Sequence, residues 1–176
     1  MAAPDWFCPL PLDCSETYGR LSIDEETLHR GAWCAFNLSP LYDSSEFRGD
    51  NVLVERLEGR VARPIVTDET DYTLRLMFSG AVKPDGTPWA APAGGILANR
   101  RAFHDTYLDP IRSGTASLPA TLEVPDPDDP NEVLVYEFDV QPLRLTGWTL
   151  LPNAYARANL DIRVPVPELV EAGGES

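Results

Sequence analysis

The chain has 176 residues and a mass of 19.4 kDa, which suits one domain with a packed core. Its 28 Asp and Glu residues against 14 Lys and Arg give a formal net charge of −14. So acidic a surface repels phosphate backbones and anionic lipid, which argues against a nucleic-acid-binding protein and against a membrane-surface helix. We expect no membrane span, because no apolar run approaches about 20 residues, and no secretion signal at Met1–Asp5.

Cys8, Cys14 and Cys34 form an odd set without C-x-x-C spacing, and only His29 and His104 could join them as ligands. A structural zinc site needs four suitably spaced nitrogen or sulfur ligands, so no metal site is predicted. The pattern favours three reduced, partly buried thiols. A disulfide between Cys8 and Cys14 stays open as the alternative.

Residues 1–30 differ from the rest of the chain, because Pro4, Pro9 and Pro11 interrupt any regular element. We predict an extended arm with one short helical turn from Ser22 to His29, capped by Ser22 with Glu25 three residues on. The arm also carries apolar residues: Trp6, Phe7, Leu10, Leu12, Tyr18 and Leu21. They predict an arm that docks on its own body or on a neighbouring subunit, so its deletion should leave a folded domain. A frayed terminus is the alternative.

From residue 31 onward, apolar and polar residues alternate with a period of two, which predicts strands with one buried and one wet face. The alternation is clearest over 156–164 and recurs over 72–78 and 134–140. We expect these strands to belong to an antiparallel sheet that packs one face on the core. Shorter strands are predicted over 32–37, 51–57, 60–67 and 117–124, with a hairpin turn at Glu58-Gly59.

One helix is predicted over 96–108, after a Pro-Gly turn at Lys83–Thr87 and a Gly-rich loop, and it should end before Pro110. Ile96, Phe103 and Tyr107 form one apolar stripe, so the helix should lie against the sheet. The Pro- and Asp-rich segment 125–131 is predicted to be a solvated acidic loop rather than a calcium site, because EF-hand spacing is absent.

The predicted elements indicate a mainly β chain with one helix (α+β class), an antiparallel β-sandwich or half-barrel with the helix on its flank. We expect an extended arm over 1–30, a β-sandwich domain over 31–166 and a flexible C-terminal tail over 167–176.

Motifs of catalysis are missing from the sequence. There is no G-x-S-x-G, no G-x-G-x-x-G and no P-loop, and the chain has one lysine, Lys83. Paired carboxylates such as Asp68-Glu69 and Asp71 are common by chance in so acidic a chain. We therefore expect a protein that is not an enzyme, with no catalytic, cofactor-binding or metal-binding residues.

Three arginines precede predicted strands at hairpin corners, namely Arg48, Arg60 and Arg63, and the next corner holds Asp68 and Glu69. Arginine forks match carboxylates bidentately and are enriched at interfaces. These five residues are the candidate subunit interface, with solvated corner charges as the alternative.

Across about residues 32–165, the order of a series of motifs resembles that in a family of tail proteins from long-tailed, siphovirus-type phages of actinobacteria. The motifs are Phe36–Leu41, Phe47–Val54, Gly59-Arg60, Ala62-Arg63, Asp68-Glu69, Leu74–Leu76, Gly80, Asp85-Gly86 and Gly94–Asn99. The resemblance implies a tail-tube or distal-tail type of fold, a β-sandwich flanked by one helix, assembled as sixfold rings.

The same resemblance implies a structural virion protein, made in the host cytoplasm, whose partners are its own copies in a homo-hexamer and neighbouring tail or connector proteins. DNA would pass the lumen without specific binding, and an acidic wall suits that role because it repels phosphates. No cofactor and no membrane are implied. A head–tail connector ring, either terminator or stopper, is the alternative position.

A second class of function is a ligand-binding β-sandwich module, for instance for carbohydrate, with Trp33, Trp89 and Trp148 as possible platforms. An uncharacterised enzyme is a third hypothesis.

Overall fold

A computed structural model describes residues 19–42, 47–48, 66–67, 70–126, 128–129, 132–165 and 170–171. The strands are β1 Arg20–Ile23, β2 Glu26–Thr27, β3 Trp33–Asn37, β4 Phe47–Arg48, β5 Val66–Thr67, β6 Thr70–Ser79, β7 Leu118–Pro125, β8 Val133–Leu151, β9 Tyr155–Val164 and β10 Val170–Glu171. The helical segments are η2 Ser39–Tyr42, α1 Pro92–Phe103, the π-helical η3 His104–Leu108, α2 Asp109–Arg112 and η4 Pro152–Ala154. The fold is mainly β with one long helical segment, as the sequence predicted.

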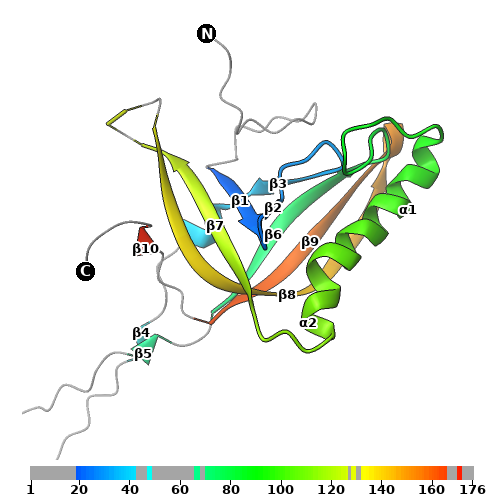
Figure 1. Cartoon of the computed structure of the whole chain (residues 1–176). Helices are drawn as coiled ribbons and strands as arrows, with labels where there is room; N and C mark the ends of the chain where they lie inside the picture. The colour runs from blue at the N-terminus through cyan, green and yellow to red at the C-terminus, as the bar shows by residue number, and fades with distance from the viewer. Residues whose placement is uncertain are drawn as a thin grey trace, which may run out of the picture.

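The strands form one curled antiparallel sheet in the order β2-β1-β7-β8-β9-β6-β3, with β10 paired to β8 and a separate β4–β5 pair. The curl brings the two ends of the sheet together at Leu28. Its N–H donates to the carbonyl of Leu21 in β1 at 2.9 Å, and its own carbonyl accepts from the N–H of Ala35 in β3 at 2.9 Å. Figure 1 shows α1 running along one side of the curl. The finer prediction of a two-layer sandwich is not confirmed.

The central strands β6 and β9 carry the alternation that the sequence predicted. Leu74, Leu76 and Phe78 are fully buried, and every second residue of β9 from Ala156 to Val164 faces the core. The two strands pair over their whole length, from Thr70↔Val164 to Ser79↔Tyr155. Because side chains alternate across a strand, the polar members of both strands share the opposite face.

Strand β8 is long because it changes partner halfway. Its first part pairs with β7 up to Val140, and from Gln141 onward it pairs with β9. Register shifts occur beside Pro142 and again between Thr146 and Thr149, around Gly147 at φ +60°. Proline and left-handed glycine are tolerated in strands at such bulges, which bend the strand. The bends let β8 turn the sheet around its core.

The helical turn predicted from Ser22 to His29 is wrong, because this segment forms the β1–β2 hairpin. The two turn residues, Asp24 and Glu25, have φ of +52° and +63°, as a type I′ turn requires. β1 pairs with β7, and Leu21, Ile23 and Leu28 have at most 1% exposure. The described part of the predicted arm is therefore built into the sheet. Residues 1–18 lie outside the described residues.

The helix begins at Pro92 instead of Ile96, with proline in its first turn, where a missing N–H costs nothing. It continues past Pro110, because a π-helical turn comes before it and proline falls in the first turn of α2. Ile96, Phe103 and Tyr107 are buried, which confirms the apolar stripe.

An aromatic cluster joins the helix to the sheet. Trp33 of β3 meets Phe103 edge-to-face at 5.4 Å and Tyr107 at 6.0 Å between ring centroids, and Phe78 lies 5.3 Å from Phe103. Such pairs add about 0.5–1.5 kcal/mol to the free energy of burial. The Tyr107 hydroxyl donates to the carbonyl of Thr27 at 2.9 Å, and burial raises the pKa of Tyr107 to about 12.

Two further predictions differ from the structure. Cys34 is disulfide-bonded rather than a reduced thiol, and its partner lies outside the described residues. Val170 and Glu171 pair with β8 opposite Glu137 and Tyr136, within the segment predicted to be a flexible tail.

The turn at Lys83–Thr87 is confirmed, with the Gly86 N–H donating to the Lys83 carbonyl at 2.9 Å and Gly86 at φ +85°.

Candidate functional site

The outer face of β6 and β9, turned away from the core, carries mostly polar side chains in facing pairs. The pairs are Asp71↔Arg163, Thr73↔Asp161, Arg75↔Asn159 and Met77↔Arg157. β8 adds Arg144 opposite Asp161 and Thr149 opposite Arg157. This face therefore holds four arginines within a chain of strong negative charge.

One half of this face is electrostatically matched. Arg163 binds Asp71 through two hydrogen bonds of 2.7 and 3.2 Å, which lower the pKa of the Asp71 carboxyl. Arg144 Nε lies 2.9 Å from Asp161 Oδ2, and the Thr73 hydroxyl donates to Asp161 Oδ1 at 2.9 Å. In this half, the basic and acidic groups satisfy one another.

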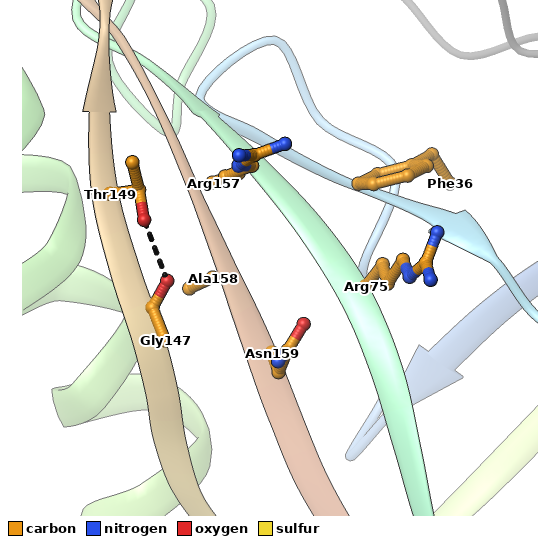
Figure 2. A pocket seen from close by; sticks show the side chains of 7 residues that line it. All are labelled: Phe36, Arg75, Gly147, Thr149, Arg157, Ala158 and Asn159. Atoms are coloured by element: carbon orange, nitrogen blue, oxygen red, sulfur yellow. Dashed lines mark hydrogen bonds between the residues drawn. The ribbon is translucent and has the colours of Figure 1, made fainter.

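The other half forms an open pocket of about 450 Å³ (Figure 2). Its lining residues are Phe36 of β3, Arg75 of β6, Gly147 and Thr149 of β8, and Arg157, Ala158 and Asn159 of β9. In Figure 2, Arg157 and Arg75 come from neighbouring strands, and the Arg75 side chain lies beside the Phe36 ring. We call this site the arginine pocket.

The two arginines of the pocket differ from those of the matched half. Arg75 and Arg157 are exposed, no carboxylate lines the pocket, and neither guanidinium forms an ion pair within the described part of the chain. Each guanidinium is a planar fork of donors that matches a carboxylate or phosphate bidentately. The pocket is therefore equipped to bind an anionic group.

The bulge in β8 shapes one wall of the pocket. Gly147 lies at φ +60°, and the Thr149 hydroxyl donates to its carbonyl at 3.2 Å (Figure 2). A Cβ at Gly147 would come within 3.2 Å of Asn159 Nδ2. Because glycine has no side chain, the space beside the Asn159 amide stays open. Glycine also permits the left-handed backbone of the bulge.

A second polar site lies inside the fold, next to the disulfide. His29 is 6% exposed, its Nδ1 lies 3.7 Å from the Cys34 sulfur, and its Nε2 has no partner within the described structure. Burial, with a smaller contribution from the positive charge of Arg20, lowers the pKa of His29 to about 4. A neutral imidazole at physiological pH follows, and its role is in packing.

The interface residues that the sequence predicted stay untested. Arg48 is in β4 opposite Val66, but its side chain is not among the described ones. Arg60, Arg63, Asp68 and Glu69 also lie outside the described residues. The structure therefore does not bring these five side chains together or separate them.

The three tryptophans considered as carbohydrate platforms do not line the arginine pocket. Trp33 is 1% exposed and belongs to the core. The Trp89 indole donates to Asn99 at 3.1 Å, and Trp148 packs 5.1 Å from Phe78 with Arg100 over its ring. Trp33 in particular is not a surface platform.

Sequence reasoning placed Arg75, Arg157 and Asn159 on solvent-facing sides of strands but did not connect them into a site. Their contact depends on the β6–β9 register, Arg75↔Asn159 and Met77↔Arg157, which alternation alone does not determine. The available signal was arginine at outward positions of two neighbouring predicted strands.

No protein-family model matches the chain, and no curated protein matches it. Among the residues described here, no helix has the length and apolar character to cross a membrane. Within the same ranges, no group of three or more His, Cys, Asp and Glu side chains is placed to hold a metal ion.

Proposed function

We propose that the chain is a structural virion protein of a long-tailed phage, forming a homo-hexameric ring in the tail through which DNA passes. The observation that carries this proposal is the fold class: a curled antiparallel sheet with one long helical segment packed on it. The resemblance to phage tail proteins implies a mainly β fold with one flanking helix, and this coarser layout supports the proposal. Such a protein acts by assembling into a ring of defined shape, so its contact surfaces carry the function and no reaction centre is needed.

The charge of the chain supports the same function. A net charge of −14 makes the wall of a conduit repel the phosphates of passing DNA, so that the DNA slides instead of binding. We place the ring at the distal tail or in the tube, with a head–tail connector ring as the alternative position. Its partners are then its own copies and the neighbouring tail proteins.

The test is the mass and shape of the assembled protein. Size-exclusion chromatography with light scattering should give a species of six times the 19.4 kDa chain mass, and negative-stain electron microscopy should show rings. A protein that stays monomeric at all concentrations and saturates with a small sugar would contradict the ring function.

A further inference from the structure

Two oppositely charged features lie at separate places on the molecule. One is the arginine pocket, with Arg75 and Arg157 unpaired within the described chain. The other is the tip of the β7–β8 hairpin, residues 126–132, which we call the acidic loop. Its sequence, Asp-Pro-Asp-Asp-Pro-Asn-Glu, carries four carboxylates and no basic residue.

The acidic loop has a defined backbone at its described positions. The Asp126 N–H donates to the Glu132 carbonyl and the Glu132 N–H to the Asp129 carbonyl, both at 3.0 Å. Asp126 Oδ1 also accepts from the Asp128 N–H at 2.7 Å. Asp128 and Glu132 are exposed, so their carboxylates are presented to solvent. The hydrogen bonds at the described positions restrict the backbone there, which lowers the entropic cost of binding.

The acidic loop does not reach the arginine pocket of its own chain. Along β8, Gly147 in the pocket lies fourteen positions after Val133, the first residue beyond the acidic loop, which is about 45 Å of strand path. Figure 1 shows the β7–β8 hairpin projecting away from β6 and β9. A contact between the two features therefore joins two molecules.

We propose that the arginine pocket of one copy binds the acidic loop of a second copy. The contact is heterologous, since one molecule supplies the loop and the next supplies the pocket, and such contacts generate rings when the rotation closes. This inference deepens the proposed function and rests on it, because it names surfaces through which the copies would join.

Chemical complementarity selects this occupant. The guanidinium groups of Arg75 and Arg157 bind carboxylates, the Asn159 amide adds a hydrogen-bond donor, and Phe36 offers an apolar rim. Double-stranded DNA would also present anions, but the net charge of −14 disfavours its approach to the rest of the surface. The acidic loop of an identical chain presents its carboxylates at the tip of a projecting hairpin, where they can enter the pocket of another copy.

The experiment compares two charge-reversed proteins in the full chain. The pocket variant is Arg75→Glu with Arg157→Glu, and the loop variant is Asp128→Lys with Glu132→Lys, which leaves Asp126 to hold the turn. In sedimentation velocity at low salt, the self-association constant of each variant alone should be at least about tenfold lower than that of the wild type.

The decisive sample is a mixture of variants that each keep one intact half of the contact. A pocket variant retains its acidic loop. The complementary protein, Asp128→Asn with Glu132→Gln, retains its pocket. Neither should form chains or rings alone, and their mixture should give a discrete 1:1 heterodimer. The control is Arg101→Glu with Arg112→Glu, which makes the same charge change at exposed helical positions and should associate like the wild type.

Several outcomes would overturn the inference. Wild-type protein that is monomeric at low salt, a mixture without heterodimer, or equal loss of association in the control would each do so. So would a fluorescent DNA duplex that binds wild type and is released by the pocket variant while self-association is unchanged. Arg75→Gln with Arg157→Gln repeats the test if the Glu variant fails to fold, as judged by circular dichroism. Hexamers that persist in both variants would reject this contact and leave the proposed ring function standing.

Discussion

Asn99 connects the helix to the end of β6 through a fully buried amide. Its Nδ2 donates to the carbonyls of Ser79 and Val82, both at 2.7 Å, and its Oδ1 accepts from the Trp89 indole at 3.1 Å. Every polar atom of the side chain is used at 0% exposure. The group therefore orients the loop between β6 and α1 as well as stabilising it.

Asn99→Leu should lower the free energy of unfolding by about 3 kcal/mol, because the Ser79 and Val82 carbonyls and the Trp89 indole N–H lose their partner. Leu97→Ala, at a 61% exposed position two residues earlier, should change it by less than about 0.5 kcal/mol. Urea unfolding followed by tryptophan fluorescence measures both. Equal effects of the two substitutions would show that the Asn99 network is dispensable.

His29 should make stability depend on pH. Burial lowers its folded-state pKa from 6.5 to about 4, so between these values the unfolded chain binds more protons than the folded chain. Stability is therefore full above pH 6.5 and is lost as the pH falls toward 4, by up to about 3 kcal/mol. His29→Leu should flatten this slope in urea titrations at a series of pH values.

His104→Gln is the control for this pH dependence. Burial, and then the charges of Arg112 and Arg100, also lower the His104 pKa, but the side chain is only partly buried. Its replacement should change the slope less than His29→Leu does. A slope that disappears with His104 and survives without His29 would reverse the assignment.

At the scale of elements, the first turn of α1 docks on the end of β6 through two glycines. A Cβ on Gly95 would overlap the Gly80 carbonyl oxygen and approach Trp89 Cδ1 to 2.7 Å, whereas Gly94 has nothing within 4 Å. Close backbone approach explains why a weak helix former occupies the Gly95 position. The helix axis is held at this distance from the sheet.

Two neighbouring substitutions should therefore act in opposite directions. Gly95→Ala should destabilise the fold by about 2 kcal/mol or more through overpacking, and Gly94→Ala should stabilise it by up to about 1 kcal/mol through helix propensity. Thermal unfolding by circular dichroism compares them. A Gly95→Ala protein as stable as wild type would mean that the helix docks elsewhere.

The β1–β2 hairpin changes what truncation does. Deletion of residues 1–30 removes Leu21, Ile23 and Leu28 from the core and exposes the edge of β7. Each buried side chain contributes about 1.5–3 kcal/mol, against a total stability of about 5–15 kcal/mol. The truncated chain should show no cooperative thermal transition, contrary to the sequence prediction of a separable arm. A sharp transition would restore that prediction.

At the scale of the whole molecule, the net charge bears on any association between copies. The net charge of −14 makes copies repel one another, so an assembly needs local basic patches that face acidic ones. The arginine pocket is one such patch, and the sequence proposes another at Arg60 and Arg63.

Arg60→Glu with Arg63→Glu should weaken ring formation without unfolding the monomer, since exposed pairs contribute only about 0–1 kcal/mol each. Adding Asp68→Arg and Glu69→Arg should partly restore it if these corners pair across subunits. Light scattering at equal concentrations compares the double and fourfold variants. If the fourfold variant assembles no better than the double, these residues are solvated corner charges.

Much of the fold could be read from local patterns. Strands 72–78 and 156–164 alternate with a period of two, and the apolar stripe of the helix repeats at helical spacing, because each element buries one side. The Gly86 turn followed from its own residues. The β1–β2 hairpin did not, because Asp24 and Glu25 are weak turn signals and the pairing of β1 with β7 spans about a hundred residues.

The sequence by itself thus determined the composition of the surfaces: an acidic chain, polar outward faces on the strands and an acidic loop that contains two prolines. Only the tertiary structure decided which of these residues meet. The β6–β9 register and the bulge at Gly147 place Arg75 and Arg157 around one pocket, while the neighbouring Arg163 and Arg144 are neutralised by Asp71 and Asp161. Register, bulges and strand exchange depend on contacts between distant segments, and local periodicity carries no information about them.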